Sequence, residues 1–296
     1  DGCPAGIDLC QQDFEKDLLR RKSGARGTTP RLESDQPLIK SGVFKGKTSG
    51  APLLIAFANT NARSKDYESL KDTPRPGHAD FTATKKYGGC NDYRGGGHFS
   101  GRLTLGLVAA GVIAKKIIQP VSIQAAIVEA GGERDIDKAV NRALEAGDSI
   151  GGIIECEAQH VPIGLGEPFF ESVESLLSHM MFSIPAIKGI EFGAGFKAAR
   201  MTGAEHNDLI LDREGRTETN FAGGINGGIS NGNPIIFRVA VKPTSSISLP
   251  QHTINMKTGK RSDLIIKGRH DTCIALRIPV VVENATAIVL ADLMLI

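Results

Sequence analysis

Residues 102–118, RLTLGLVAAGVIAKKII, decide the fold, because this segment is apolar on nearly every side at helical spacing. A helix that is apolar all round is buried all round, so we expect it at the centre of the molecule. Residues 279–296, PVVVENATAIVLADLMLI, predict a second buried helix that closes the chain. No run reaches the roughly 18 uninterrupted apolar residues that cross a bilayer, so we expect no membrane span.

Shorter helices and strands surround these two segments. Helical spacing predicts helices over 12–22, 135–147 and 167–183. Strands are predicted over 121–129, 151–159, 186–196 and 235–243, and as a pair joined by a Gly/Ser/Lys turn within 38–60. Residues 202–234 are expected to be one long irregular segment. Because several neighbouring strands look like hairpins, the pattern indicates an α+β class and one domain, 1–296.

The composition excludes several classes of protein. With 35 basic and 33 acidic residues the formal net charge is +2, which argues against a dedicated nucleic-acid surface. No Trp and three Tyr leave few aromatic platforms for an RNA-binding module. Five cysteines without Cys-x-x-Cys spacing favour free thiols over a disulfide framework or a zinc site. We therefore expect no metal, no nucleic acid and a reducing, cytoplasmic setting.

Two nucleotide-binding motifs are absent. Residues 42–48, GVFKGKT, have three residues between the glycines where a P-loop has four, and they join two strands instead of opening a helix. No glycine-rich stretch matches G-x-G-x-x-G, so a Rossmann dinucleotide site is not expected.

Clusters of glycine and cations remain to be explained. The stretch RPGHADFTATKKYGGCNDYRGGGHFSGR at 75–102 has little hydrophobic periodicity, and similar runs are NFAGGINGGISNG, KPTSSI and KGRHDTC. Each run alone is compatible with a flexible loop. Together they indicate a pocket for a multiply anionic ligand, because glycines leave backbone amides uncovered and Lys, Arg, Ser and Thr donate to anions.

The same motifs, in order, resemble those of the chorismate synthase family: RPGHAD, YGGCNDYRGGGHFSGR, GLGEPFFESVES, FSIPAIKGIEFGAGF, NFAGGINGGISNG, KPTSSI and GRHD. The resemblance extends from residue 1 to residue 296. The GESHG motif of that family, with one of its two functional histidines, is not in this sequence, and we expect it upstream of Asp1.

The resemblance implies a β-α-β sandwich of antiparallel sheets around central helices, in a homotetrameric lyase of the shikimate pathway. It implies a 1,4-anti elimination of phosphate from 5-enolpyruvylshikimate 3-phosphate to give chorismate. Reduced FMN would be required without net redox change. It leaves open whether the flavin is reduced with NADP or by an external flavin reductase, and we expect the external supply.

The resemblance also assigns site residues by motif position. His78 and Asp271 are the expected catalytic residues, the first as a donor to the reduced flavin and the second as an aid to proton removal. Substrate anions are expected to contact five arginines: Arg21, Arg26, Arg75, Arg102 and Arg269. Flavin contacts are expected from Ser100, Asn220, Ala222, Gly223, Lys242 and Ser246. His98 is expected to line the pocket wall.

Two alternatives remain open from the residues themselves. The pocket suits a different FMN-dependent oxidoreductase, or a flavin-binding protein without catalytic activity. For Asp271, a salt bridge to Arg269 is the structural alternative to a catalytic role.

Overall fold

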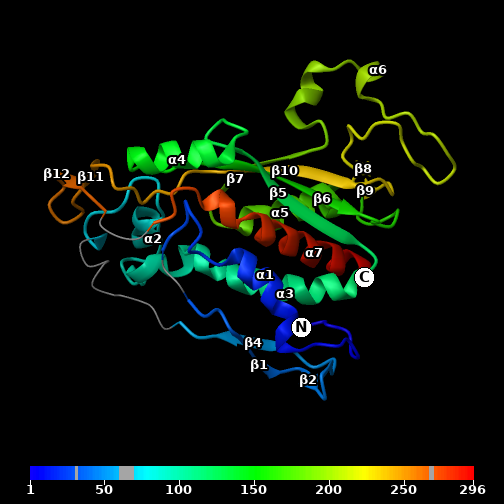
Figure 1. Cartoon of the computed structure of the whole chain (residues 1–296), viewed down its shortest axis with the longest axis horizontal. Coiled ribbons are helices and arrows are strands. Elements are labelled where there is room, and N and C mark those ends of the chain that lie inside the picture. The colour runs from blue at the N-terminus through cyan, green and yellow to red at the C-terminus, as the bar shows by residue number, and fades with distance from the viewer. Residues whose placement is uncertain (31–32, 60–69, 267–269) are drawn as a thin grey trace.

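The computed structural model describes residues 1–30, 33–59, 70–266 and 270–296. Helices α1, α3 and α7 lie between a four-stranded sheet on one side and a two-stranded sheet on the other (Figure 1). The α-helices are α1 (Glu15–Arg21), α2 (Asp80–Lys86), α3 (Thr104–Ile117), α4 (Ile136–Ala146), α5 (Val173–Ser183), α6 (Gly203–His206) and α7 (Pro279–Leu295). The strands are β1 (Pro37–Ser41), β2 (Val43–Phe44), β3 (Lys47–Thr48), β4 (Leu54–Phe57), β5 (Ser122–Ala130), β6 (Gly152–Gln159), β7 (Ile187–Phe192), β8 (Ile225–Asn226), β9 (Ile229–Ser230), β10 (Ile235–Val241), β11 (Gln251–Ile254) and β12 (Arg261–Leu264).

The four-stranded sheet is antiparallel throughout, in the order β5-β6-β10-β7. Phe237 in β10 pairs with Cys156 in β6 and Phe192 in β7, so β10 lies inside the sheet. Alternate β10 residues are buried, which is the period of a strand with one face on the core. The second sheet pairs β1 with β4, also antiparallel. The expected α+β sandwich with central helices is confirmed.

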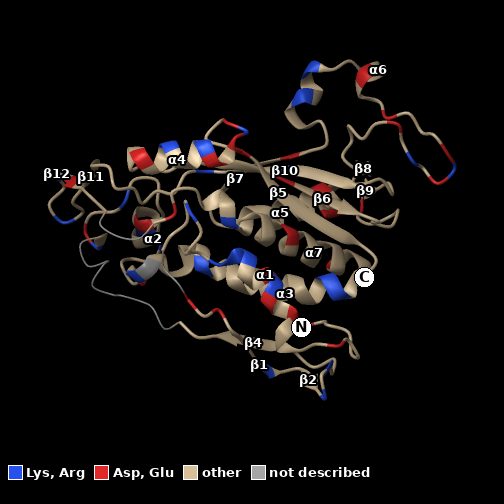
Figure 2. Ribbon diagram, viewed as in Figure 1, with Lys and Arg blue, Asp and Glu red and all other residues tan. Residues whose placement is uncertain are grey.

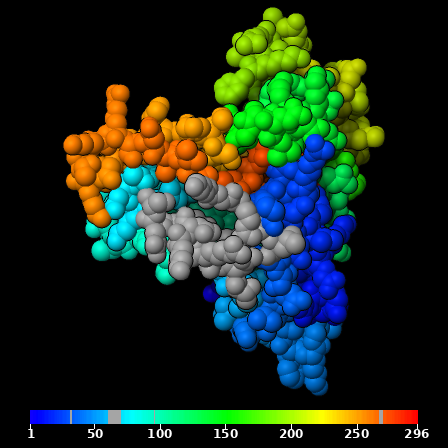
Figure 3. All heavy atoms as spheres, turned by 60° about the vertical axis from the view of Figure 1, so that its left-hand side comes forward, coloured from blue at the N-terminus to red at the C-terminus, as the bar shows by residue number. Residues whose placement is uncertain are grey.

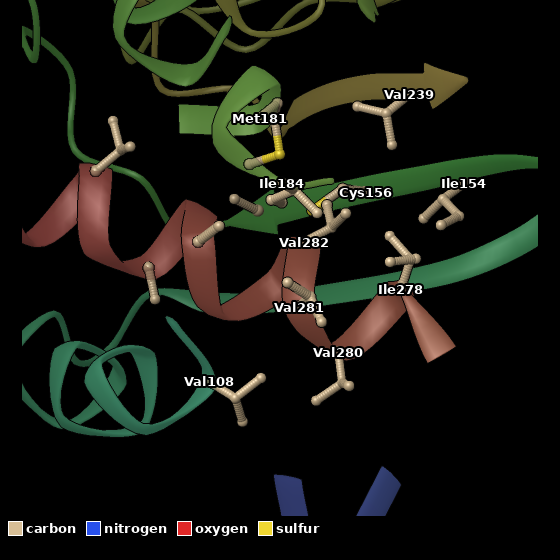
Figure 4. Packing of buried hydrophobic residues seen from close by; sticks show 14 of the residues in the cluster. Val108, Ile154, Cys156, Met181, Ile184, Val239, Ile278, Val280, Val281 and Val282 are labelled. Atoms are coloured by element: carbon tan, nitrogen blue, oxygen red, sulfur yellow. The ribbon is translucent and has the colours of Figure 1, made fainter. Parts of the chain in front are cut away.

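The central helix predicted over 102–118 is confirmed as α3, and the closing helix as α7. The two pack so closely that a side chain at Gly111 of α3 would place its Cβ 2.2 Å from the Cβ of Asn284 of α7. Figure 4 shows α7 between α3 and β6, with Val280 directed toward Val108 and Val282 toward Cys156. Because residues 280–287 of α7 are all buried, the apolar composition of this part of the helix is needed on nearly every side.

The sequence predictions were inexact in three places. The helix expected over 167–183 begins only at Val173, since Ser172 caps its first turn and Phe169 has a left-handed backbone with φ of 68°. The segment expected to be irregular, 202–234, contains α6 and the β8–β9 hairpin. Helix α2 and the β11–β12 hairpin were missed, because short polar elements carry almost no hydrophobic periodicity.

A charge cluster is enclosed in the middle layer and is called here the helix charge cluster. Glu283 of α7, 4% exposed, accepts hydrogen bonds at 2.6 Å from both terminal nitrogens of Arg20. Lys115 of α3 donates to Asp17 of α1 at 2.7 Å. Figure 2 shows the charged segments of α1, α3 and α7 side by side in this layer. The side-chain amide of Asn284 donates to Asp17 at 2.9 Å and completes the cluster. Its members are Asp17, Arg20, Lys115, Glu283 and Asn284.

The five cysteines are free thiols, as expected. Burial raises the pKa of Cys156 to about 12, so this thiol is a core residue and not a nucleophile. Among the described residues, no helix has both the length and the apolarity to cross a membrane.

Candidate active site

A cavity of about 210 Å³ lies where α1 ends and where α3 and α7 begin. Helix N-termini carry partial positive charge, so α3 and α7 both favour an anion at this place. The charged and polar residues of its lining are Arg21, Ser23, Thr29, Glu33, Asp35, Ser100, Arg102, Thr104, Asp271 and Arg277. Four residues predicted from sequence therefore meet in one cavity: Arg21, Ser100, Arg102 and Asp271.

Arg21 enters this cavity from the last turn of α1 and is only 3% exposed. Its Nε donates to the Thr104 hydroxyl at 3.1 Å, and its Nη1 lies 3.3 Å from Asp35. Burial and the positive charges of Arg277 and Arg102 lower the pKa of Arg21 to about 10, although Asp35 opposes them. Because the protein disfavours the charged form of Arg21, any further anion that enters the cavity stabilises this guanidinium.

Arg102 stands beside Arg21, and the two arginines share Asp35. Arg102 Nη1 donates to Asp35 at 3.0 Å, and its Nη2 lies 2.6 Å from Glu33. Ser100 accepts a hydrogen bond from the Arg102 backbone amide at 3.2 Å, which fixes the turn before α3. The two carboxylates hold the cations side by side against their mutual repulsion.

Asp271 also lines the cavity, and two neighbouring residues donate to its carboxylate. The Thr29 backbone amide donates to its Oδ1 at 2.9 Å, and Nη1 of Arg277 lies 3.3 Å from both carboxylate oxygens. Arg277 was not singled out from sequence, because it stands in the apolar run IALRIP at 274–279. The ion pair of Asp271 observed here is with Arg277; Arg269 lies outside the described residues.

Arg75, His78 and Asp80 form a second cluster at the start of α2. Arg75 is 8% exposed and donates to the two oxygens of Asp80 at 2.7 and 2.9 Å. His78 Nδ1 lies 2.5 Å from Asp80 Oδ1, which makes Nδ1 the protonated ring nitrogen, and Nε2 lies 3.2 Å from Nη2 of Arg75. Burial raises the pKa of Asp80, but hydrogen bonds from Arg75 and His78 outweigh it and hold this pKa well below its ordinary value.

The KPTSSI segment, which follows β10, covers this second cluster. Ser246 accepts a hydrogen bond from Arg75 at 3.0 Å, and the Lys242 ammonium donates to the carbonyl of Gly77. The Thr244 hydroxyl is buried and makes no hydrogen bond to the described part of the chain. Four further predicted residues thus come together here: Arg75, His78, Lys242 and Ser246.

The cavity and its lining, the first cluster, adjoin the second cluster of Arg75, His78 and Asp80. A Cβ at Gly96 would lie 3.7 Å from His78 Nε2 and 3.8 Å from the Cβ of Ser100, which lines the cavity. His270 precedes Asp271, and its pKa is lowered first by burial and then by the charge of Arg75. Its buried Nε2 has no hydrogen-bond partner among the described residues. The imidazole of His270 is therefore neutral at neutral pH and stands between the clusters.

Asn220, Ala222 and Gly223 are not near these clusters. They lie beside β8 and β9, at the opposite end of the molecule from α2 and the β11–β12 hairpin (Figure 1). Figure 3 shows the orange hairpin against the cyan α2 region, while the yellow-green α6 region stands apart. A Cβ at Gly223 would lie 2.5 Å from the backbone nitrogen of Gly193, so close chain packing alone requires glycine there.

The remaining predicted residues are at the surface or outside the described residues. Arg26 is exposed in the loop after α1, and His98 is exposed before α3 instead of lining the cavity. The structure adds Asp35, Asp80 and Arg277 to the site. Asp80 belongs to the quoted RPGHAD motif, and its spacing of five residues from Arg75 was the available signal.

A larger groove, of about 950 Å³, lies between α3, α5, α7 and β4. Among the residues described in its lining there is no lysine or arginine, and most are aliphatic, including Leu53, Ile113 and Ile288. A multiply charged ligand has nothing to bind there, so the smaller polar cavity is the candidate site.

Comparisons with known proteins agree over the whole chain. The family model described as chorismate synthase matches residues 1–295. The chain is 64% identical over 296 residues to the chorismate synthase of Chitinophaga pinensis, with 100% of this chain and 89% of that protein covered. It is 46% identical over 327 residues to the chorismate synthase of Dehalococcoides mccartyi, at coverages of 100% and 90%. It also resembles a crystal structure of chorismate synthase, with a TM-score of 0.74, 27% identity and coverages of 100% and 86%.

Proposed function

We infer how the site works from one premise: the chain belongs to the chorismate synthase family. It is a carbon–oxygen lyase that forms chorismate from 5-enolpyruvylshikimate 3-phosphate by 1,4-anti elimination of phosphate. The observation that carries the assignment of the site is the cavity that Arg21, Arg102 and Asp271 line together. It combines anion-binding groups with a carboxylate that can help to move a proton.

Arg21 and Arg102 are proposed to bind the phosphate and carboxylates of the substrate. A guanidinium presents a planar fork that matches both kinds of anion. Both side chains are already held by Asp35, so little rotamer freedom remains to be lost on binding. Arg26, Arg75 and Arg269 stay proposals for the same role; Arg75 uses its donors on Asp80 and Ser246.

Reduced FMN is the proposed cofactor, and the second cluster fits it. The fit rests on the buried Thr244 hydroxyl, which lacks a partner among the described residues and stands in the same segment as Lys242 and Ser246. The ring of His78, 3.2 Å from Arg75 through Nε2, belongs to the same cluster. When bound, reduced FMN would lend electron density to the elimination and recover it as the hydrogen leaves. Ser100 connects this cluster with the cavity.

His78 and Asp271 are the proposed catalytic residues. Asp80 fixes the ring of His78 with the proton on Nδ1, so Nε2, which lies 3.2 Å from Arg75, is the atom that would hold or release a proton toward the cofactor. Asp271 assists proton removal from the substrate side of the site. Oδ1 accepts from both Thr29 and Arg277 and Oδ2 from Arg277 alone, so Oδ2 is the oxygen with more capacity to accept the proton.

Asn220, Ala222 and Gly223 remain proposed flavin contacts on the family resemblance alone. We also propose a homotetramer with a cytoplasmic location and an external flavin reductase, NADP-dependent reduction by the chain itself being the alternative. The exposed Phe169 and Phe170, at 87% and 88%, suit contacts between subunits.

The function is tested by mixing the protein with reduced FMN and 5-enolpyruvylshikimate 3-phosphate without oxygen. We expect phosphate release with no net oxidation of the flavin. Stoichiometric flavin oxidation would instead indicate an oxidoreductase, and flavin binding without either reaction would indicate a binding protein. A sample with His78→Ala is the matched control for phosphate release from other sources.

A further inference from the structure

Arg277 contacts two residues of the proposed site, Arg21 and Asp271, and the proposed function gives Arg277 itself no role. It ends the 3-10 helix Ile274–Arg277, immediately before α7. Its side chain is 18% exposed and lines the cavity. The cavity wall at this point is otherwise aliphatic, with Ile274, Ile278 and Val281. The guanidinium of Arg277 therefore takes its polar partners from outside its own segment.

The contacts of Arg277 join two functional side chains. Its Nε donates to the backbone carbonyl of Arg21 at 3.0 Å, which anchors the guanidinium to the end of α1. From that anchor Nη1 reaches both oxygens of Asp271, each at 3.3 Å. The Thr29 amide holds the same carboxylate from the other side. Because the terminal torsion of an aspartate is broad, two separate donors are needed to fix the plane of its carboxylate.

The positive charge of Arg277 is unfavourable for the charged form of the neighbouring Arg21. After burial, the charge of Arg277 is the largest influence that lowers the pKa of Arg21. Two cations side by side in a buried site repel each other, so this arrangement costs stability. The hydrogen bonds to Asp271 are long for charged partners, so they hold orientation more than they contribute stability.

We propose that Arg277 is a positioning residue that keeps the Asp271 carboxylate directed into the cavity, in line with substrate held by Arg21. The inference rests on the proposed role of Asp271 in proton removal. Arg277 acts through Asp271 and not on the substrate itself. Its loss therefore affects the chemical step and leaves substrate binding in place.

A double-mutant cycle tests this proposal. Arg277→Met, Asp271→Asn and the double variant are compared for kcat, for substrate Kd by calorimetry with oxidised FMN, and for thermal unfolding. We expect Arg277→Met to lower kcat about 10- to 100-fold, because a carboxylate misplaced by about 1 Å loses that much rate. Substrate Kd should change less than about threefold, and Arg277→Lys should recover part of kcat. In the Asp271→Asn background, Arg277→Met should change kcat less than about threefold.

The outcomes separate the inference from the function on which it rests. Effects on kcat that multiply in the double variant would overturn the proposal, as would a large rise in Kd with kcat unchanged. If Asp271→Asn keeps near-normal kcat, the role of Asp271 fails, and the inference fails with it. Arg238→Met is the matched control, since Arg238 pairs with Glu191 on the sheet and is not in the cavity. If Arg277→Met does not fold, Arg277→Lys and Arg277→Gln carry the same cycle.

Discussion

Arg20 and Arg21 follow one another on α1, yet they enter opposite surroundings. Arg20 turns into the helix charge cluster, where Glu283 binds it with two hydrogen bonds of 2.6 Å. Arg21 turns into the cavity, where its contact with Asp35 is 3.3 Å. Hydrogen bonding to Glu283 raises the pKa of Arg20, whereas burial and the charge of Arg277 lower that of Arg21 to about 10.

The difference separates a structural use of buried charge from a functional one. In the helix charge cluster each charge already has a close partner inside the protein, so the pairs hold α1 against α7. In the cavity the ion pairs of Arg21 and Arg277 are longer, at 3.3 Å each, and both arginines line open volume, so an incoming anion improves the electrostatics. We therefore expect substitutions in the first region to alter stability, and substitutions in the second to alter binding and turnover.

The largest effect is expected from Glu283→Ala. This change leaves Arg20, Lys115 and the Ala125 amide without their shared acceptor in the core. Breaking such a buried network costs about 3–5 kcal/mol of unfolding free energy. Chemical denaturation measures the change, and Glu133→Ala, in an exposed ion pair with Arg142, is the control with an effect below about 1 kcal/mol. An equal effect of the two variants would remove the distinction between the regions.

Asp271→Asn is expected to have the largest effect on turnover. Removing one positioned catalytic group typically lowers kcat by about 10²–10³-fold. The unfolding free energy should change by less than about 1 kcal/mol, because Asp271 is held by only two moderate hydrogen-bond donors. Steady-state phosphate release and thermal unfolding check the two halves of this expectation. Near-normal turnover at saturating reduced FMN would contradict it.

His78→Ala extends the same comparison to the second cluster. Loss of Nε2 should lower turnover by about 10²-fold, with Asp80 still held by Arg75 and the fold kept. The measurement is phosphate release together with the Kd of FMN. His252→Ala, in the exposed β11–β12 hairpin, is the matched control and should leave both unchanged. Equal losses in the two variants would show that His78 has no special role.

The sequence could predict the fold wherever apolar periodicity was strong. The central helix, the closing helix and the stop of α4 at Gly147, whose φ is 67°, were all predictable from local chemistry. Helix α2 was not, because DFTATKK at 80–86 has no apolar face. The resemblance of motifs, and not periodicity, pointed to the arginines of the cavity.

The partners of those arginines were harder to find. Asp35 and Arg277 are far apart in the chain and reach the cavity only because α1 packs against α3 and α7. A high density of glycine was a misleading signal for a ligand site in one segment. Gly223 is needed there because any Cβ would collide with the backbone of Gly193. A glycine-rich loop that folds on itself and one that binds a ligand have the same composition.

Asp80 gives the smallest expected effect and a dependence on pH. Its pKa is lowered on folding from an ordinary value of 3.8, so its contribution to stability is complete above that pH and is lost as the pH falls further. Asp80→Asn should therefore destabilise the protein by about 2 kcal/mol near pH 6, and by progressively less below about pH 4. Denaturation at several pH values measures this, with Asp263→Asn in the exposed hairpin as control. A difference that stays constant down to about pH 2 would rule out the ion pair as its cause.

The most direct test compares Arg20→Met with Arg21→Met, measuring unfolding free energy and substrate Kd in both. Arg20→Met should lower the unfolding free energy by about 2 kcal/mol, less than a fully buried pair because Arg20 is 40% exposed, and should leave Kd within about threefold. Arg21→Met should weaken Kd about 10- to 100-fold. It should change stability by less than about 1 kcal/mol, because removing a buried charge beside Arg277 offsets the hydrogen bonds lost to Thr104 and to backbone carbonyls. If Arg21→Met instead lost stability and kept its affinity, the cavity would be a structural charge cluster and not the substrate site.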